Sequence, residues 1–147
     1  MLLHEYETTI IIRPDVDEAD VKDIVERFEE RLGDAKATLL LRDDWGSRKM
    51  AYTIGNHGKG RYVLFNFLSD ADAIAELERR LRIEDRVLRF LTIRVADSPD
   101  VPTRIAEAAE LRVRKAEEAA RRAAEAELRA AQEAEAEAAR QSMLPAE

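Results

Sequence analysis

The chain has 147 residues, no cysteine and a formal net charge of −7. This length can bury one core of ordinary size, and the lack of cysteine excludes disulfides, thiolate metal sites and cysteine nucleophiles. The N-terminus lacks the basic start and apolar run of a signal peptide, and no apolar run approaches the roughly 20 residues of a membrane helix. We therefore expect a cytoplasmic protein that does not associate with membranes.

The first predicted elements are a strand and a helix. Residues 4–13 contain the β-branched run Thr8-Thr9-Ile10-Ile11-Ile12, which predicts a strand. Asp17 can cap the helix that follows, and Gly33 is expected to end it. Apolar side chains within the helix recur at i, i+3, i+4, i+7 and i+11, at Val21, Ile24, Val25, Phe28 and Leu32.

Two further strands are predicted in the middle of the chain. Residues 37–42 and 47–54 alternate as one long strand with a bend at Trp45-Gly46. The glycine-rich segment 55–60 predicts a turn or loop, because glycine favours tight changes of direction. Residues 61–68 predict the next strand.

A second helix and a last strand complete the predicted domain. Ser69 or Asp70 can cap a helix in which apolar residues again share one face, and residues 87–95 predict a strand. The order βαββαβ is typical of the α+β, ferredoxin-like fold. Right-handed crossovers place both helices on one face of a four-stranded antiparallel sheet and leave the other face without a helix.

The last predicted strand carries large apolar side chains on both of its faces. Val87, Leu91, Ile93 and Val95 alternate with Leu88, Phe90, Thr92 and Arg94. Apolar residues on an uncovered sheet face suggest a partner protein, and we assign Tyr52, Leu88 and Phe90 to that surface. The alternative is that these are ordinary surface residues, since apolar atoms are common on any protein surface.

The composition changes near Ser98-Pro99, after which Ala, Glu and Arg dominate. We therefore predict a domain over residues 1–97 and a tail over residues 98–147. Pairs of Glu and Arg spaced by four residues favour a solvated helix. The tail has few large apolar residues and no sustained heptad, which argues against a coiled coil and leaves partial disorder as the alternative.

Residues that could carry catalysis or bind metals are scarce. The only histidines, His4 and His57, show no metal-ligand spacing. Segment 55–60 lacks the Lys-Ser/Thr ending of a phosphate-binding loop, and no nucleophile elbow is present. We expect neither an enzyme nor a bound metal, cofactor or small-molecule substrate.

Nucleic-acid binding is favoured by the local distribution of charge. Residues 42–61 hold 5 basic and 2 acidic side chains, and residues 79–94 hold 6 basic and 2 acidic ones. A polyanion responds to such patches more than to the net charge. Tyr6, Tyr52 and Tyr62 are available for stacking on bases. The predicted RNA-binding cations on or near the strands are Arg48, Lys49, Arg61, Arg86, Arg89 and Arg94, each of which could instead be a solvated surface residue.

Several motifs resemble the bacterial small-subunit ribosomal protein six family. The most specific is the run Asp44-Trp45-Gly46-Ser47-Arg48-Lys49-Met50-Ala51-Tyr52-Thr53-Ile54. Further matches are Tyr6-Glu7, Arg13-Pro14-Asp15, Tyr62-Val63-Leu64 and the run from Leu81 to Arg89. The resemblance covers residues 4–96.

The resemblance implies a ferredoxin-like fold and a structural role in the small ribosomal subunit. It also implies binding to the central domain of small-subunit rRNA together with ribosomal protein eighteen, which would cover the exposed apolar surface. Arg48, Lys49 and Arg89 would then neutralise rRNA phosphates. The alternative from another functional class is a ligand-sensing or oligomerising ferredoxin-like domain without an RNA role.

Overall fold

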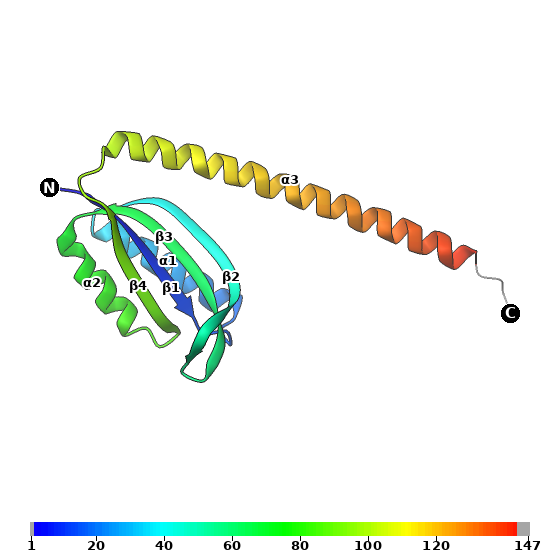
Figure 1. Ribbon diagram of the computed structural model, residues 1–147, viewed down its shortest axis with the longest axis horizontal. Coiled ribbons are helices and arrows are strands. Elements are labelled where there is room, and N and C mark those ends of the chain that lie inside the picture. Colours follow the sequence, from blue (N-terminus) through cyan, green and yellow to red (C-terminus); the bar gives the residue numbers. More distant parts are fainter. Residues whose placement is uncertain (1, 144–147) are drawn as a thin grey trace. The chain divides into compact units, whose positions relative to one another are not determined.

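The computed structural model describes residues 2–143 and shows a βαββαβ domain that continues into a long helix (Figure 1). The strands form one antiparallel sheet in the order β2-β3-β1-β4, which confirms the predicted ferredoxin-like fold. The elements are β1 (His4–Ile12), α1 (Glu18–Asp34), β2 (Thr38–Ile54), β3 (His57–Ser69), α2 (Ala71–Arg82), β4 (Val87–Ala96) and α3 (Val101–Ser142).

The main core lies between the sheet and the helices α1 and α2. Alternate residues of β1 and β3 point toward these helices, so the helix-facing side of these two central strands is buried. The rings of Phe28 on α1 and Phe65 on β3 have centroids 4.6 Å apart, and both side chains are buried. Burial of each such ring contributes roughly 1.5–3 kcal/mol. This core fixes which face of the sheet is left for other contacts.

The caps of α1 confirm one sequence prediction and correct another. The Asp17 carboxylate accepts a hydrogen bond from the Asp20 backbone N–H at 2.8 Å, as the predicted N-cap. The prediction that Gly33 ends the helix is wrong, because α1 runs to Asp34. Lys36 adopts the left-handed conformation, with φ 56°, and so reverses the chain.

Strand β2 is continuous through the predicted bend. Asp44 pairs with Val63 and Gly46 pairs with Tyr62, so Trp45 is the extra residue of a β-bulge. Gly46 has φ 71°, which suits glycine at such a position. The bulge sharpens the local twist of β2 in front of the cations that follow.

The turn after β2 is shorter than the sequence suggested. The prediction of a loop over residues 55–60 is wrong, because β3 already begins at His57. Ile54 pairs with His57, and the two residues between them, Gly55 and Asn56, both have positive φ. This is the backbone of a tight two-residue hairpin turn, so Lys59 lies on a strand.

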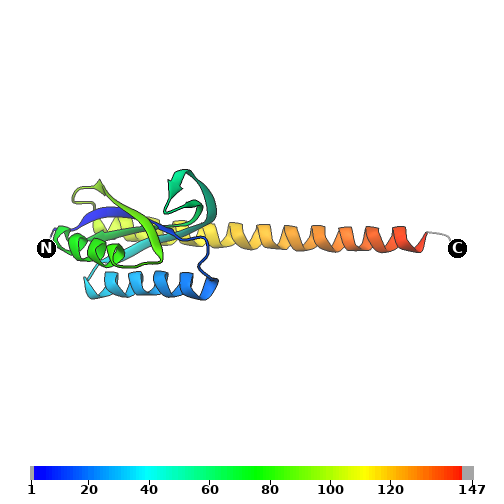
Figure 2. The same cartoon turned by 90° about the horizontal axis from the view of Figure 1, so that it is seen from below.

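The β2–β3 hairpin bends away from α1 and curls over the other face of the sheet (Figure 2). The curl brings β3 against β1 at Gly60, which is buried. A Cβ atom at residue 60 would lie 2.5 Å from the Ile11 Cγ2 methyl and 3.4 Å from the Ile12 carbonyl oxygen. Only a residue without a side chain fits there, so Gly60 permits the curl.

The start of α3 belongs to the first compact unit, which extends to Ala108. Arg104 donates to both carboxylate oxygens of Glu5, at 2.9 and 2.7 Å, and Asn66 donates to Glu5 at 3.0 Å. Ala108 packs with Leu40 and Leu68 in a second small core. These contacts explain why the unit continues past the predicted boundary at residue 97.

The second compact unit begins at Ala109, and its described part is a helix that ends at Ser142. Nearly all of its side chains are exposed. Arg122 pairs with Glu118 one turn earlier, as the spacing of the charges predicts. Within the described residues, the chain from Ala109 to Ser142 is therefore a solvated helix.

We predict that Gly60→Ala lowers the free energy of unfolding by about 1–3 kcal/mol, because the added methyl overlaps the rigid, β-branched side chain of Ile11. Gly58→Ala is the matched control, since a Cβ there meets nothing within 4 Å. Urea denaturation of the two variants measures the difference. Equal stability of the two would show that the close approach at Gly60 is unimportant.

We predict that Arg104→Ala costs about 1–3 kcal/mol of stability near neutral pH, because it leaves the Glu5 carboxylate buried with fewer donors. The hydrogen bonds from Arg104 are the main cause that lowers the pKa of Glu5 below its ordinary value of 4.5. Arg122→Ala, which breaks an exposed pair, should cost much less.

The same pair predicts a dependence on pH. A depressed carboxyl pKa adds stability that is complete above the unfolded pKa and is lost as the pH falls through the folded pKa. The difference in unfolding free energy between wild type and Arg104→Ala should therefore shrink as the pH falls below 4.5. A difference that stays constant in acid would exclude Glu5 as its cause.

Candidate nucleic-acid interface

Two of the predicted RNA-binding cations, Arg48 and Lys49, lie side by side on β2 just past the bulge and are exposed. In the described part of the chain neither side chain forms an ion pair with a carboxylate. Both charges are therefore open to an anion from outside the protein.

Lys49 lies directly opposite Lys59 in the pairing of β2 with β3. Both side chains are exposed, and within residues 2–143 no carboxylate pairs with either one. Like charges that face each other across two strands repel and destabilise the hairpin. An anion between them would remove this repulsion. Lys59 was missed as a site residue because the sequence placed it in a loop.

An aromatic column lies on the opposite face of the hairpin from this lysine pair, because neighbouring strand residues point to opposite faces. The Arg48 guanidinium carbon lies 5.0 Å from the centroid of the Trp45 ring, which places the cation over the ring. The Trp45 and Tyr62 rings are stacked, with centroids 6.3 Å apart and planes inclined by 17°. The column holds Arg48 in place on the groove side of the hairpin without neutralising its charge.

Two other predicted cations, Arg61 and Arg86, are used inside the domain. Arg61 pairs with Asp44 at 2.6 Å and with Glu18, and its side chain is only 22% exposed. These bonds join β3 to β2 and to the start of α1. The charge of Arg61 is therefore compensated within the protein.

Arg86 lies between β4 and α1. It donates to Glu84 at 2.8 Å and to Asp23 at 3.0 Å, and its side chain is 20% exposed. Its hydrogen bond is the main cause that lowers the pKa of Asp23. Arg94 is more open but pairs with Asp97 at 3.0 Å and lies over the Tyr6 ring. Arg86 and Arg94 thus have structural partners.

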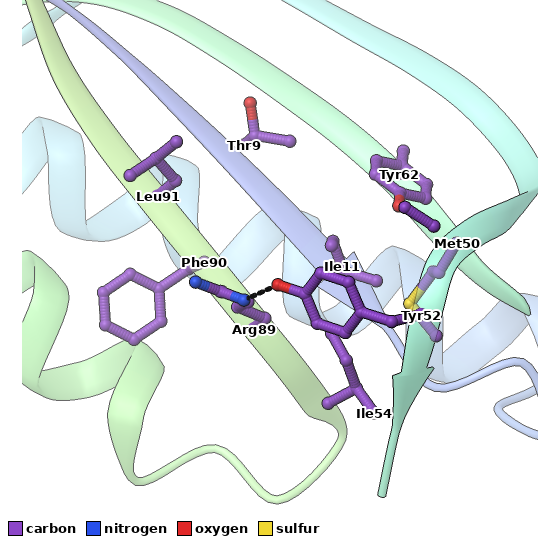
Figure 3. Close-up of a pocket in the computed structure, with 10 residues that line it drawn as sticks. Thr9, Ile11, Met50, Tyr52, Ile54, Tyr62, Arg89, Phe90 and Leu91 are labelled. Atoms are coloured by element: carbon purple, nitrogen blue, oxygen red, sulfur yellow. Dashed lines mark hydrogen bonds between the residues drawn. The ribbon is translucent and has the colours of Figure 1, made fainter. Parts of the chain in front are cut away.

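Arg89 borders a groove on the sheet face that α1 and α2 leave open (Figure 3). We call it the tip groove, because the curled end of the hairpin forms one wall. Its volume is about 290 Å³. Arg89 donates a hydrogen bond to the Tyr52 hydroxyl across the groove, and no carboxylate among the described residues pairs with it. The main lining side chains are Ile11, Met50, Tyr52, Ile54, Tyr62 and Leu91.

The three residues predicted for the partner surface lie in different environments. Tyr52 is 61% exposed and forms a wall of the tip groove. Leu88 is half-buried. Phe90 pairs with Ile10, packs against the core on the helix side and lies under the Arg82 guanidinium. The structure therefore brings Tyr52 and Arg89 together but turns the Phe90 ring away from them (Figure 3).

The most exposed apolar side chains of β4 belong to the other set of alternating residues, the set that does not include Leu88 and Phe90. Leu91 is 62% exposed, and Ile93 and Val95 are also exposed. Thr8 pairs with Thr92, and their hydroxyls are hydrogen-bonded at 2.8 Å, which sets the register of β4 against β1. The sequence shows that two sets of residues alternate along β4. Only the register of β4 against β1 shows which set points away from the helices.

No group of three or more His, Cys, Asp or Glu residues that could hold a metal ion occurs within residues 2–143. None of the helices described has the length and apolar character needed to span a membrane. The features that remain are the exposed cations of the hairpin and β4, together with the aromatic column and the tip groove on the open face.

Known proteins are similar to this chain in sequence and in fold. The family model described as Ribosomal protein S6 matches residues 5–94. Small ribosomal subunit protein bS6 of Trichlorobacter lovleyi is 41% identical over 112 residues, which cover 74% of this chain and 92% of the relative. The protein of the same name from Caldanaerobacter subterraneus subsp. tengcongensis is 42% identical over 95 residues, which cover 65% of this chain and 100% of the relative.

A solved structure agrees with these relatives. The crystal structure of 30S ribosomal protein S6 from Thermotoga maritima matches with a TM-score of 0.61 and 30% sequence identity, over 63% of this chain and 87% of that chain. The matches confirm the resemblance found in the sequence, and the family consists of structural ribosomal proteins rather than enzymes. The chain therefore belongs to the ribosomal protein S6 family of the small ribosomal subunit.

Proposed function

We propose that this protein binds small-subunit rRNA, in its central domain, through the exposed cations of the β2–β3 hairpin and β4. The observation that carries the proposal is the pair Lys49–Lys59, two like charges opposite each other without a carboxylate among the described residues. Arg48 and Arg89 add two further cations without a carboxylate partner in that part of the chain. Phosphates of an rRNA backbone would compensate all four charges.

The structure supports a smaller set of RNA contacts than the sequence did. Arg61, Arg86 and Arg94 remain candidates, but each would have to exchange an internal ion pair for a phosphate. Such an exchange gains less than the pairing of a free cation. We therefore assign the phosphate contacts first to Arg48, Lys49, Lys59 and Arg89.

A partner protein would cover the apolar part of the open sheet face. Leu91, Ile93 and Val95 form an exposed apolar row on β4, at the edge of the sheet. We propose ribosomal protein eighteen as this partner, a role that the family membership suggests. Contact between the two proteins beside the cations would help an acidic protein bind a polyanion, because the partner adds binding energy that does not depend on this chain's net charge.

We predict that replacing both Arg48 and Lys49 with Ala weakens binding to small-subunit rRNA and flattens its dependence on salt. Each lost phosphate contact should reduce the slope of log K against log salt by roughly 0.7–0.9. Filter binding over a series of salt concentrations, with and without the partner protein, measures both effects.

The matched control replaces Arg79 and Arg80, two exposed cations on α2 that pair with Glu76. This control should leave the affinity and the slope nearly unchanged. Unaltered rRNA binding by the Arg48 and Lys49 variant, with its fold intact, would remove both residues from the interface. A free homodimer that does not sediment with small ribosomal subunits would favour the ligand-sensing or oligomerising alternative.

A further inference from the structure

We propose that the tip groove receives one unstacked nucleobase of a single-stranded RNA segment. This inference rests on the proposed rRNA binding and names what the groove recognises beside the phosphates. The groove has a volume of about 290 Å³, which is just below the range of roughly 300–1,000 Å³ that is usual for ligand sites. A space of this size suits a single base better than a duplex or a folded partner.

The chemistry of the groove walls fits a flat aromatic ring. Ile11 and Met50 provide apolar contact, while Tyr52 and Tyr62 provide aromatic rings. Bases that leave a helical stack are commonly held by aromatic side chains, because every base has a π face. The hydroxyls of Thr9 and the two tyrosines supply polar groups for the edge of a base.

The tyrosines are held in place before any ligand arrives. The Arg89 guanidinium donates to the Tyr52 hydroxyl and lies 6.0 Å from its ring centroid, so Tyr52 is oriented although it is exposed. Tyr62 is stacked on Trp45, which is itself covered by Arg48. A preorganised site loses less conformational freedom on binding than a mobile one.

The charge around the groove favours RNA over a cationic protein segment. Arg89 is the one charged residue that lines the groove, and none of the lining residues is acidic. Arg48 lies two residues before Met50, a lining residue, and therefore on the same face of β2. A base in the groove would therefore have cations close to the phosphates on either side of it, whereas a basic peptide would be repelled.

The test uses two fluorescent RNA backbones of seven residues. One is abasic except for a single central adenine, and the other is abasic throughout. Both carry the same phosphates, so their affinity ratio reports only the base. Anisotropy titrations at low salt with the full chain should show about ten-fold tighter binding of the adenine-bearing probe, in keeping with the usual strength of base–aromatic stacking.

Substitutions at Tyr52 assign the preference to the groove. Tyr52→Leu keeps apolar bulk but removes the ring, and it should abolish the preference for the adenine-bearing probe. Tyr52→Phe keeps the ring and should retain the preference. Ile93→Ser is the matched control, because it removes an exposed apolar side chain of β4 that does not line the groove. Since Tyr52 is exposed, these variants should fold like the wild type.

The Lys49 and Lys59 double variant separates this inference from the proposed function, because neither lysine lines the groove. This variant should lower the affinity for both probes equally and leave the ratio of the two affinities unchanged. Unaltered affinities would contradict only the proposed phosphate contacts and not the base site. Equal binding of the two probes by the wild type, no binding of either, or a preference that survives Tyr52→Leu would overturn the base site. If Tyr52→Leu abolished binding of the partner protein but kept the preference for the adenine-bearing probe, the groove would be a binding site for the partner protein and not for a base.

Discussion

The close approach of Gly60 to Ile11 is the constraint on which the functional face depends. Because residue 60 has no side chain, β3 can lie against β1 while the hairpin curls over the open face of the sheet. The curl carries Tyr52 far enough to meet Arg89 on β4. It also places Lys49 and Lys59 on a strand pair that leaves the body of the sheet. The tip groove depends on this curl, because Met50 and Tyr52 of the hairpin line it.

The two faces of the sheet serve different purposes. The helix-facing side is a continuous apolar core that includes Phe28 and Phe65. Within the first compact unit, different segments cover the two ends of the opposite face of the sheet. At one end Arg104 and Ala108 from the start of α3 cover Glu5, Leu40 and Leu68, while at the other end the hairpin curls over Ile11. The apolar row on β4 stays exposed, which matches the proposed role of a partner protein.

The fold was predictable from local signals, whereas much of the site was not. The period-3.6 pattern of α1 and the β-branched run of β1 identify their elements without tertiary information. Whether a cation forms an ion pair within the protein depends on residues far apart in sequence, as the pairing of Arg61 with Glu18 shows. The environment of Phe90 depends on the register of β4 against β1. Lys59 could have been found from the tight turn at Gly55-Asn56, which fixes its register opposite Lys49.

The central claim is that the hairpin keeps a repulsive lysine pair because RNA compensates it. The most direct measurement compares folding stability and rRNA affinity for Lys59→Glu. A glutamate opposite Lys49 replaces repulsion with attraction, so the free protein should gain roughly 0.2–1 kcal/mol of stability. The same change puts a negative charge at the phosphate site, so rRNA affinity should fall. Opposite changes in the two quantities support the account, while unchanged rRNA affinity or a loss of stability would contradict it.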